Sequence, residues 1–279
     1  MIRQRLSHRQ NGVSPDGPYE GVPDHLRHVV MVWFQDVLHI SGSLAYRIEE
    51  MRKLAVVFRV NLPTNTNSQR LSEVLCALLE HDDDEVAIDL IDATLGVVSP
   101  GLNGWFGLQE HLTTGASAWR VNDERDGLTR VVSDESQATY DAATATADAA
   151  TTELRTAWSH AFGRNGDPSD AWDHAIKAVE DVLVPVVVPN KAKGTLGDVL
   201  GQLGSPQSAP AWEMILPGAD QSHDVAPLVA MLRLMWPNHD RHGGNTPKRT
   251  PSPEEARAVV TLAATIVQWH RQAWVVRKR

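Results

Sequence analysis

Apolar positions along much of the chain recur every three or four residues, which is the spacing of a helix with one buried face. The clearest stripe covers residues 26–38, directly after the helix-opening sequence at 22–24. The same spacing predicts helices over residues 44–60 and around residues 71–79. A fourth helix is predicted to begin at the acidic run 82–85, where negative charge suits the helix dipole.

The middle of the chain has a different pattern. Two alternating stretches, 117–121 and 128–132, flank a polar loop and predict a β-hairpin over residues 117–132. A lone hairpin is marginally stable, so this one is expected to pack on the neighbouring helices. The Ala/Thr-rich segment 136–161 predicts one long helix that ends near Gly163, because alanine favours helix.

The remaining sequence again has helical spacing, with clear start and stop signals. Ser252, Pro253 and Glu255 form a serine cap, an N1 proline and an N3 glutamate at the start of the last helix. A proline-containing run at 184–189 is expected to stop an earlier helix. The basic tail 277–279 suits a helix C-terminus. Helices are predicted from 168 to 183, from 195 to 203, from 224 to 234 and from 252 onward.

The expected fold class is therefore mainly α with one β-hairpin in the middle. The expected organisation is a flexible N-terminal arm over 1–20, a helical region with the hairpin over 21–135, and a helical domain over 136–279.

Composition narrows the functional classes. The chain has 279 residues, of which 42% are hydrophobic and 22% charged, an ordinary globular balance. Its net charge of -9 argues against a broad electrostatic grip on nucleic acid, although a small basic site remains compatible. Cys76 is the single cysteine and lies in an apolar helical stretch, so we expect a buried residue, no intrachain disulfide and a cytoplasmic protein. No apolar run is long enough to predict a membrane span.

The common phosphate-loop, dinucleotide, zinc-protease and serine-hydrolase motifs do not occur in the sequence. The best functional lead is a polar turn between two apolar helices. It concentrates amide, carboxylate, imidazole and guanidinium groups before two glycines, which permit a close backbone approach to a ligand. The turn consists of Asn238, His239, Asp240, Arg241, His242, Gly243 and Gly244.

The residues of the polar turn leave three uses open. Arginine can clamp a phosphate and histidine can transfer protons near neutral pH, which together suit RNA cleavage without a metal. His239, Asp240 and His242 could instead bind zinc or manganese. The third use is structural, with Arg241 paired to a neighbouring helix; from spacing alone this structural use is favoured.

Three ordered stretches, 170–180, 193–200 and 234–243, resemble the C-terminal domain of bacterial abortive-infection proteins, a branch of the HEPN superfamily. The resemblance covers about 110 residues up to the end of the chain. It implies a HEPN-like helical bundle over 136–279, often dimeric, and a phage-defence protein that is an RNase without a metal or cofactor. RNA or a nucleotide would be its partner.

The resemblance assigns Arg241 and His242 as the catalytic pair. Active relatives place four to six residues between the arginine and the histidine, whereas here the two are adjacent. Arg233 and His239 have the expected separation, but Leu234 replaces the polar residue that usually follows the arginine. A catalytically inactive nucleotide- or protein-binding module is therefore the alternative.

Other residues are expected to support the site. Glu180 is either an exposed surface carboxylate or a group that orients Arg241. Asn238, His239 and Asp240 complete the supporting set, with Arg233 beside them. Most of the nine tryptophans are expected to pack in cores, but Trp236, next to the turn, is the candidate for contact with a ligand.

Overall fold

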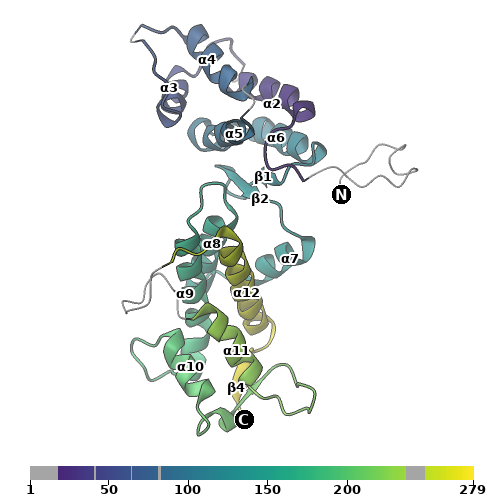
Figure 1. Cartoon of the computed structure of the whole chain (residues 1–279), viewed down its shortest axis with the longest axis vertical. Helices are drawn as coiled ribbons and strands as arrows, with labels where there is room; N and C mark the ends of the chain where they lie inside the picture. Colours follow the sequence, from purple (N-terminus) through teal and green to yellow (C-terminus); the bar gives the residue numbers. More distant parts are fainter. Residues whose placement is uncertain (1–17, 41, 64, 81–82, 237–248) are drawn as a thin grey trace, which may run out of the picture. The chain divides into compact units, whose positions relative to one another are not determined.

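The computed structural model describes residues 18–40, 42–63, 65–80, 83–236 and 249–279 (Figure 1). The chain divides into two compact units, Met1–Val131 and Val132–Arg279, and each has its own hydrophobic core. The protein is mainly helical, as predicted. The predicted boundary after residue 135 lies close to the observed one.

The first unit is a group of helices with a small hairpin. Helix α2 packs against α4 and α6, while α3 packs against α4 and α5. Large apolar side chains such as Phe34, Leu54 and Leu90 are fully buried between them, and Cys76 is buried as expected. Its helices are α2 (Asp24–Val37), α3 (Ile48–Val57), α4 (Ser68–Glu80), α5 (Asp84–Val98) and α6 (Leu102–Thr114).

Two helices of this unit differ from the prediction. The second begins at Ile48 rather than at residue 44, because the chain before it forms a turn closed by the bridge between His39 and Tyr46. Helix α6 was not predicted. Gly104 and Gly107 interrupt its apolar spacing, so its sequence lacks a continuous stripe.

The predicted hairpin is confirmed. Strands β1 (Trp119–Val121) and β2 (Leu128–Arg130) pair antiparallel. Side chains from the helices satisfy backbone N–H groups of the hairpin: Leu128 donates to Asp92 Oδ1 at 2.6 Å, and Val121 donates to Gln109 Oε1 at 2.9 Å. The hairpin therefore packs on α5 and α6, as its low intrinsic stability requires.

The last residues of the predicted N-terminal arm, 18–20, have defined contacts. Tyr19 forms a parallel bridge with Ser117, and the backbone carbonyl of Glu20 accepts a hydrogen bond from Trp119 Nε1 at 2.8 Å. The carboxylate of Glu20 also forms a two-pronged ion pair with Arg130. Residues 18–20 thus form part of the first unit, and residues 1–17 lie outside the described chain.

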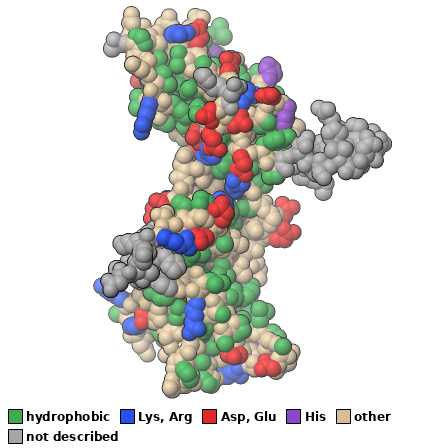
Figure 2. Space-filling view, in the orientation of Figure 1, with side chains coloured by type: hydrophobic (Ala, Val, Ile, Leu, Met, Phe, Trp, Pro, Cys, Tyr) green, Lys and Arg blue, Asp and Glu red, His purple; other side chains and the backbone are tan. Residues whose placement is uncertain are grey.

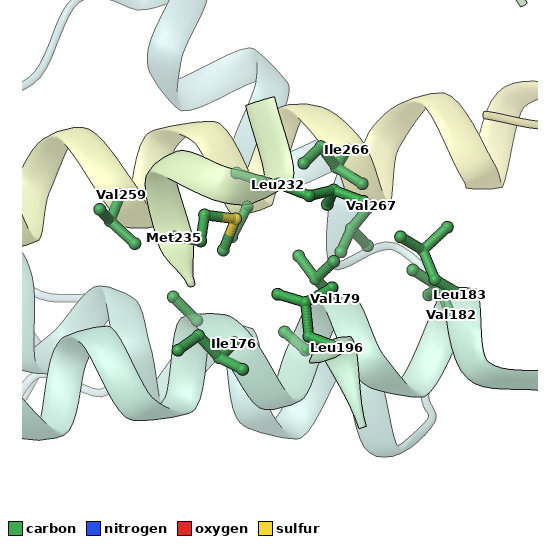
Figure 3. Packing of buried hydrophobic residues seen from close by; sticks show 14 of the residues in the cluster. Ile176, Val179, Val182, Leu183, Leu196, Leu232, Met235, Val259, Ile266 and Val267 are labelled. Atoms are coloured by element: carbon green, nitrogen blue, oxygen red, sulfur yellow. The ribbon is translucent and has the colours of Figure 1, made fainter. Parts of the chain in front are cut away.

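The second unit is a helical bundle. Helix α9 packs against both α8 and α12, and α12 also contacts α7 (Figure 1). Apolar side chains from α9, α10, α11 and α12 meet in its core, among them Val179, Leu232 and Val267 (Figure 3). Its helices are α7 (Asp134–Ala143), α8 (Ala149–Phe162), α9 (Pro168–Val187), α10 (Leu196–Gly204), α11 (Ala226–Met235) and α12 (Pro253–Gln272), with a 3-10 turn, η1 (Ala209–Ala211).

The long helix predicted over 136–161 is wrong, because the segment forms α7 and α8 with a break between them. Asp148 caps α8 by accepting a hydrogen bond from the backbone N–H of Thr151 at 2.9 Å. Thr144 donates to the carbonyl of Tyr140 in the last turn of α7. Threonine and aspartate side chains compete for backbone hydrogen bonds in this way, and that competition ends helices in spite of neighbouring alanines.

The end of α9 also differs. The helix continues through Pro185 to Val187, past the predicted stop. Proline removes only one backbone donor, and burial of Val187 in the core stabilises the extra residues.

The basic tail does not end a helix. Residues Val276–Lys278 form β4, which pairs antiparallel with β3 (Trp212–Met214) in a second small sheet. Val276 is buried there, and Arg277 Nε lies 2.6 Å from Glu213 Oε1. The side chains on this strand thus have a packing role, and the prediction of a single hairpin was incomplete.

Candidate functional site

The polar turn falls outside the described residues. The last described residue before the turn is Trp236, and the next described residue is Arg249. Between them lie Asn238, His239, Asp240, Arg241 and His242. Three of the predicted site residues are described: Glu180, Arg233 and Trp236. The structure gives the positions of these three residues.

Glu180 is half-buried on α9 and is engaged with the backbone. Its Oε1 accepts a hydrogen bond from the N–H of Leu196, the first residue of α10, at 2.6 Å. Burial raises the pKa of this carboxyl, and the hydrogen bond from Leu196 partly opposes that rise. The interpretation of Glu180 as an exposed surface carboxylate is therefore wrong. Its orientation of Arg241 stays a prediction.

Trp236 lies at the same end of α10. A Cβ atom on Gly197 would lie 3.3 Å from Trp236 Cζ2, so the indole rests against the first turn of that helix. The position of Met235, the residue before Trp236, is also fixed, because Trp172 Nε1 donates to the carbonyl of Met235 at 2.8 Å. The structure thus brings Glu180 and Trp236 to one place, the N-terminal end of α10.

Arg233 lies elsewhere. It is exposed on α11, and its Nη2 would lie 3.4 Å from a Cβ on Gly204, at the C-terminal end of α10. Leu234 beside it is 69% exposed. Arg233 and Glu180 therefore contact opposite ends of a nine-residue helix. This separation argues against Arg233 and Glu180 acting together in one site.

A pair of imidazoles in the second unit was missed from the sequence. The rings of His160 on α8 and His174 on α9 are parallel within 4°, with their centroids 6.2 Å apart. His174 Nδ1 lies 2.5 Å from Glu153 Oε2, and both side chains are about one-quarter exposed. The residues come from two helices and share no short motif, so no local signal in the sequence identifies them.

The hydrogen bonds fix different proton positions on the two rings. The backbone N–H of Asp167 donates to His160 Nδ1 at 3.2 Å, so the neutral ring has its proton on Nε2. A carboxylate cannot donate, so His174 places its proton on Nδ1 toward Glu153 and leaves a lone pair on Nε2. The neutral pair therefore presents one N–H hydrogen-bond donor, on His160, and one nitrogen that can accept a proton, His174 Nε2.

Two further features bear on ligand binding: the arrangement of metal-ligating side chains and the distribution of charge on the surface. Within the described ranges, no group of three or more His, Cys, Asp and Glu side chains is arranged to hold a metal ion. The alternative metal site at His239, Asp240 and His242 lies outside those ranges. On the face drawn in Figure 2, acidic and basic side chains are interspersed over the described surface rather than gathered by sign.

None of the described helices combines the length and the apolar character needed to cross a membrane.

Comparison with known proteins finds no relative of this chain. No profile of a protein family, no curated protein sequence and no solved structure matches the chain.

Proposed function

We propose that the protein is a phage-defence effector of the abortive-infection type whose second unit cleaves RNA without a metal. The described feature that supports this most is the imidazole pair, since His174 Nε2 can accept a proton beside the ring of His160 in the same helical unit. The ordered resemblance of residues 170–180, 193–200 and 234–243 to abortive-infection domains supplies the biological context.

In the proposed reaction, one imidazole removes the proton from the ribose 2'-hydroxyl, which attacks the adjacent phosphorus. A second group protonates the 5'-oxygen as its bond to phosphorus breaks. Arg241 would stabilise the negative charge that develops on the phosphorane. His242 is the proposed acid or base, supported by Asn238, His239, Asp240 and Glu180.

The test is incubation of the purified protein with cellular RNA and tRNA in EDTA. We expect Arg241→Ala and His242→Ala each to lower the cleavage rate at least a hundredfold, because removal of a charge-stabilising donor or of an acid–base group typically costs that much. His28→Ala is the matched control, since His28 is an exposed histidine in the first unit. Equal background cleavage by wild type and His242→Ala would overturn the nuclease proposal at the polar turn.

The same assay separates the two histidine sites. Loss of cleavage in His174→Ala and Glu153→Gln, with His242→Ala fully active, would assign proton transfer to the imidazole pair instead. Circular dichroism of each variant excludes loss of fold as the cause.

A binding module without catalysis is the second candidate. The observation that favours it is the hydrogen bond from Leu196 to Glu180, which occupies an oxygen of the carboxylate otherwise assigned to Arg241. Thermal shift with a panel of nucleotides tests this candidate. Stabilisation that is lost in Arg241→Ala, without RNA cleavage by the wild type, would support binding.

We also propose that the protein acts in the cytoplasm as a homodimer. Light scattering after size-exclusion chromatography measures the molar mass, and a value near 30.7 kDa would contradict the dimer.

A further inference from the structure

The first unit contains an open groove of about 780 Å³ between α2, α6 and the turn that precedes α3. This volume lies within the range of small-molecule sites, roughly 300–1,000 Å³. Its walls are mainly apolar and include Trp33, Val37 and Pro100. The groove lies within one unit and is independent of the proposed RNA-cleaving site.

Two glycines of α6 in the groove have different physical roles. A Cβ on Gly104 would lie 2.7 Å from Pro100 Cβ, and the carbonyl of Gly104 accepts a hydrogen bond from Trp33 Nε1 at 2.7 Å. Gly104 is therefore required by close packing. A Cβ on Gly107 would meet no atom within 4 Å, so packing does not require a glycine there.

Glycine inside a helix costs about 1 kcal/mol relative to alanine. Gly107 lowers the stability of the helix in this way although a Cβ atom there would meet no neighbouring atom of the described structure within 4 Å. The absence of a side chain there keeps the groove open. A glycine at this position leaves space for a bound molecule.

Several polar side chains line the groove, and Ser99 adds a hydroxyl to the ionisable ones. The ionisable ones are Arg47, His39 and His111, against the single carboxylate of Asp36. Arg47 is half-buried, its Nε donates to the carbonyl of His39 at 3.0 Å, and no ion pair joins it to a carboxylate of the described chain. Its remaining guanidinium N–H groups can therefore bind an anion in the fork geometry typical of arginine.

We propose that this groove binds a small aromatic organic anion. Its anionic head would pair with Arg47, and its aromatic body would lie along the apolar wall beside Gly107. The net charge of the whole chain is -9, so an anion would be held by Arg47 itself rather than attracted by the overall charge.

The probe is 1-anilinonaphthalene-8-sulfonate, an aromatic anion whose fluorescence rises on binding in an apolar site. We expect saturable binding at one site per chain. The uncharged analogue N-phenyl-1-naphthylamine should bind at least tenfold more weakly, because it lacks the group that pairs with Arg47. Equal affinity for the two probes would overturn the anionic class.

Two variants locate the site. Gly107→Leu should abolish saturable binding by filling the groove, and it should not lower helix stability because leucine is the better helix former. Arg47→Gln should weaken binding of the sulfonate about tenfold while leaving the uncharged probe unaffected. Binding that persists unchanged in Gly107→Leu would overturn the placement of the ligand.

Matched controls exist for both variants. Gly201 lies in α10 and, like Gly107, has no atom within 4 Å of a built Cβ, so Gly201→Leu makes the same change in the other unit. Arg52→Gln removes an exposed arginine that pairs with Glu49 on α3. Both controls should bind the sulfonate as the wild type does. Loss of binding in either one would show that the probe reports general surface change and would overturn the proposal.

Discussion

The two units are built from the same kind of amphipathic helix but use their polar residues differently. The second unit contains two 20-residue helices, α9 and α12, which pack against each other and bring ionisable groups into contact between elements. The first unit also has ion pairs between elements, such as Arg27 with Asp84, but it has no described helix longer than 15 residues and leaves Arg47 beside an open groove without a carboxylate partner in the described chain. Helical patterning alone therefore does not determine whether polar groups become paired between helices or remain available to a ligand.

The largest expected effect tests whether the units are independent. Leu75 and Leu183 are fully buried in the cores of the first and second units. Replacement of either with alanine should cost about 3 kcal/mol, the usual loss for a buried leucine. In calorimetry, Leu75→Ala should lower the transition of the first unit alone, and Leu183→Ala that of the second.

A single transition that both variants lower equally would contradict independent units. Leu44→Ala provides a control, because Leu44 is 92% exposed and its replacement should change neither transition.

A smaller effect is expected at two aspartate caps, one in each unit. Asp83 caps α5 by accepting from the N–H of Glu85, whereas Asp148 caps α8 and also forms an ion pair with Arg271. Asp83→Ala should cost about 1 kcal/mol. Asp148→Ala should cost more, because it also removes the partner of a largely buried guanidinium. Urea unfolding at neutral pH measures both losses, and an equal loss would contradict the added role of Arg271.

The cap in the second unit also predicts a pH dependence. The hydrogen bond from Arg271 is the largest cause that lowers the pKa of Asp148 below its usual 3.8. A lowered pKa in the folded state contributes stability above pH 3.8, and this contribution is lost as the pH falls through the folded-state pKa. The difference between wild type and Asp148→Ala should therefore shrink in acid. A difference that stays constant to pH 2 would show that the charge of Asp148 is not involved.

The smallest effect separates hydrogen bonding from charge at Glu180. Glu180→Ala removes the acceptor for Leu196 N–H and should cost about 1 kcal/mol. Glu180→Gln keeps an acceptor and removes a desolvated charge, so at neutral pH it should be as stable as the wild type or slightly more stable.

The pH dependence of stability that Glu180 confers on the wild type has the opposite sign to that at Asp148. Because burial raises the folded-state pKa of Glu180 above 4.5, the wild type should lose stability as the pH rises from below 4.5 through that raised value. Glu180→Gln should lack this loss. Urea titrations at pH 4 and pH 7 provide the measurement, and a greater advantage of Glu180→Gln at pH 4 would contradict the argument.

Local signals in the sequence predicted much of the fold. The serine–glutamate capping box at Ser252 and Glu255 and the stripe 26–38 identified α12 and α2. Where the prediction failed, a distant residue decided the structure. The break between α7 and α8 depends partly on Arg271, which contacts Asp148 from α12, and the pairing partner of β4 lies more than 60 residues earlier.

The candidate sites were less accessible from the sequence. Glu180 was identified from the sequence as a candidate, but its partner, the N–H of Leu196, depends on how α10 packs against α9. His160 and His174 meet because two helices lie side by side, and Arg47 and His111 line one groove because the turn before α3 lies close to α6. Such groups become recognisable only once the packing of the helices is known.

Strand β4 has a consequence for how the protein is made. The first unit is formed by contacts among residues up to Val131. These residues have therefore been synthesised while the rest of the chain is still being translated. The second unit needs residues 276–278 to pair with β3, and these leave the ribosome after every helix of the bundle. Domains generally fold during synthesis in the order in which they emerge. The first unit can thus fold during translation, whereas the second unit exposes the unpaired strand β3 to chaperones and proteases until its last strand is synthesised.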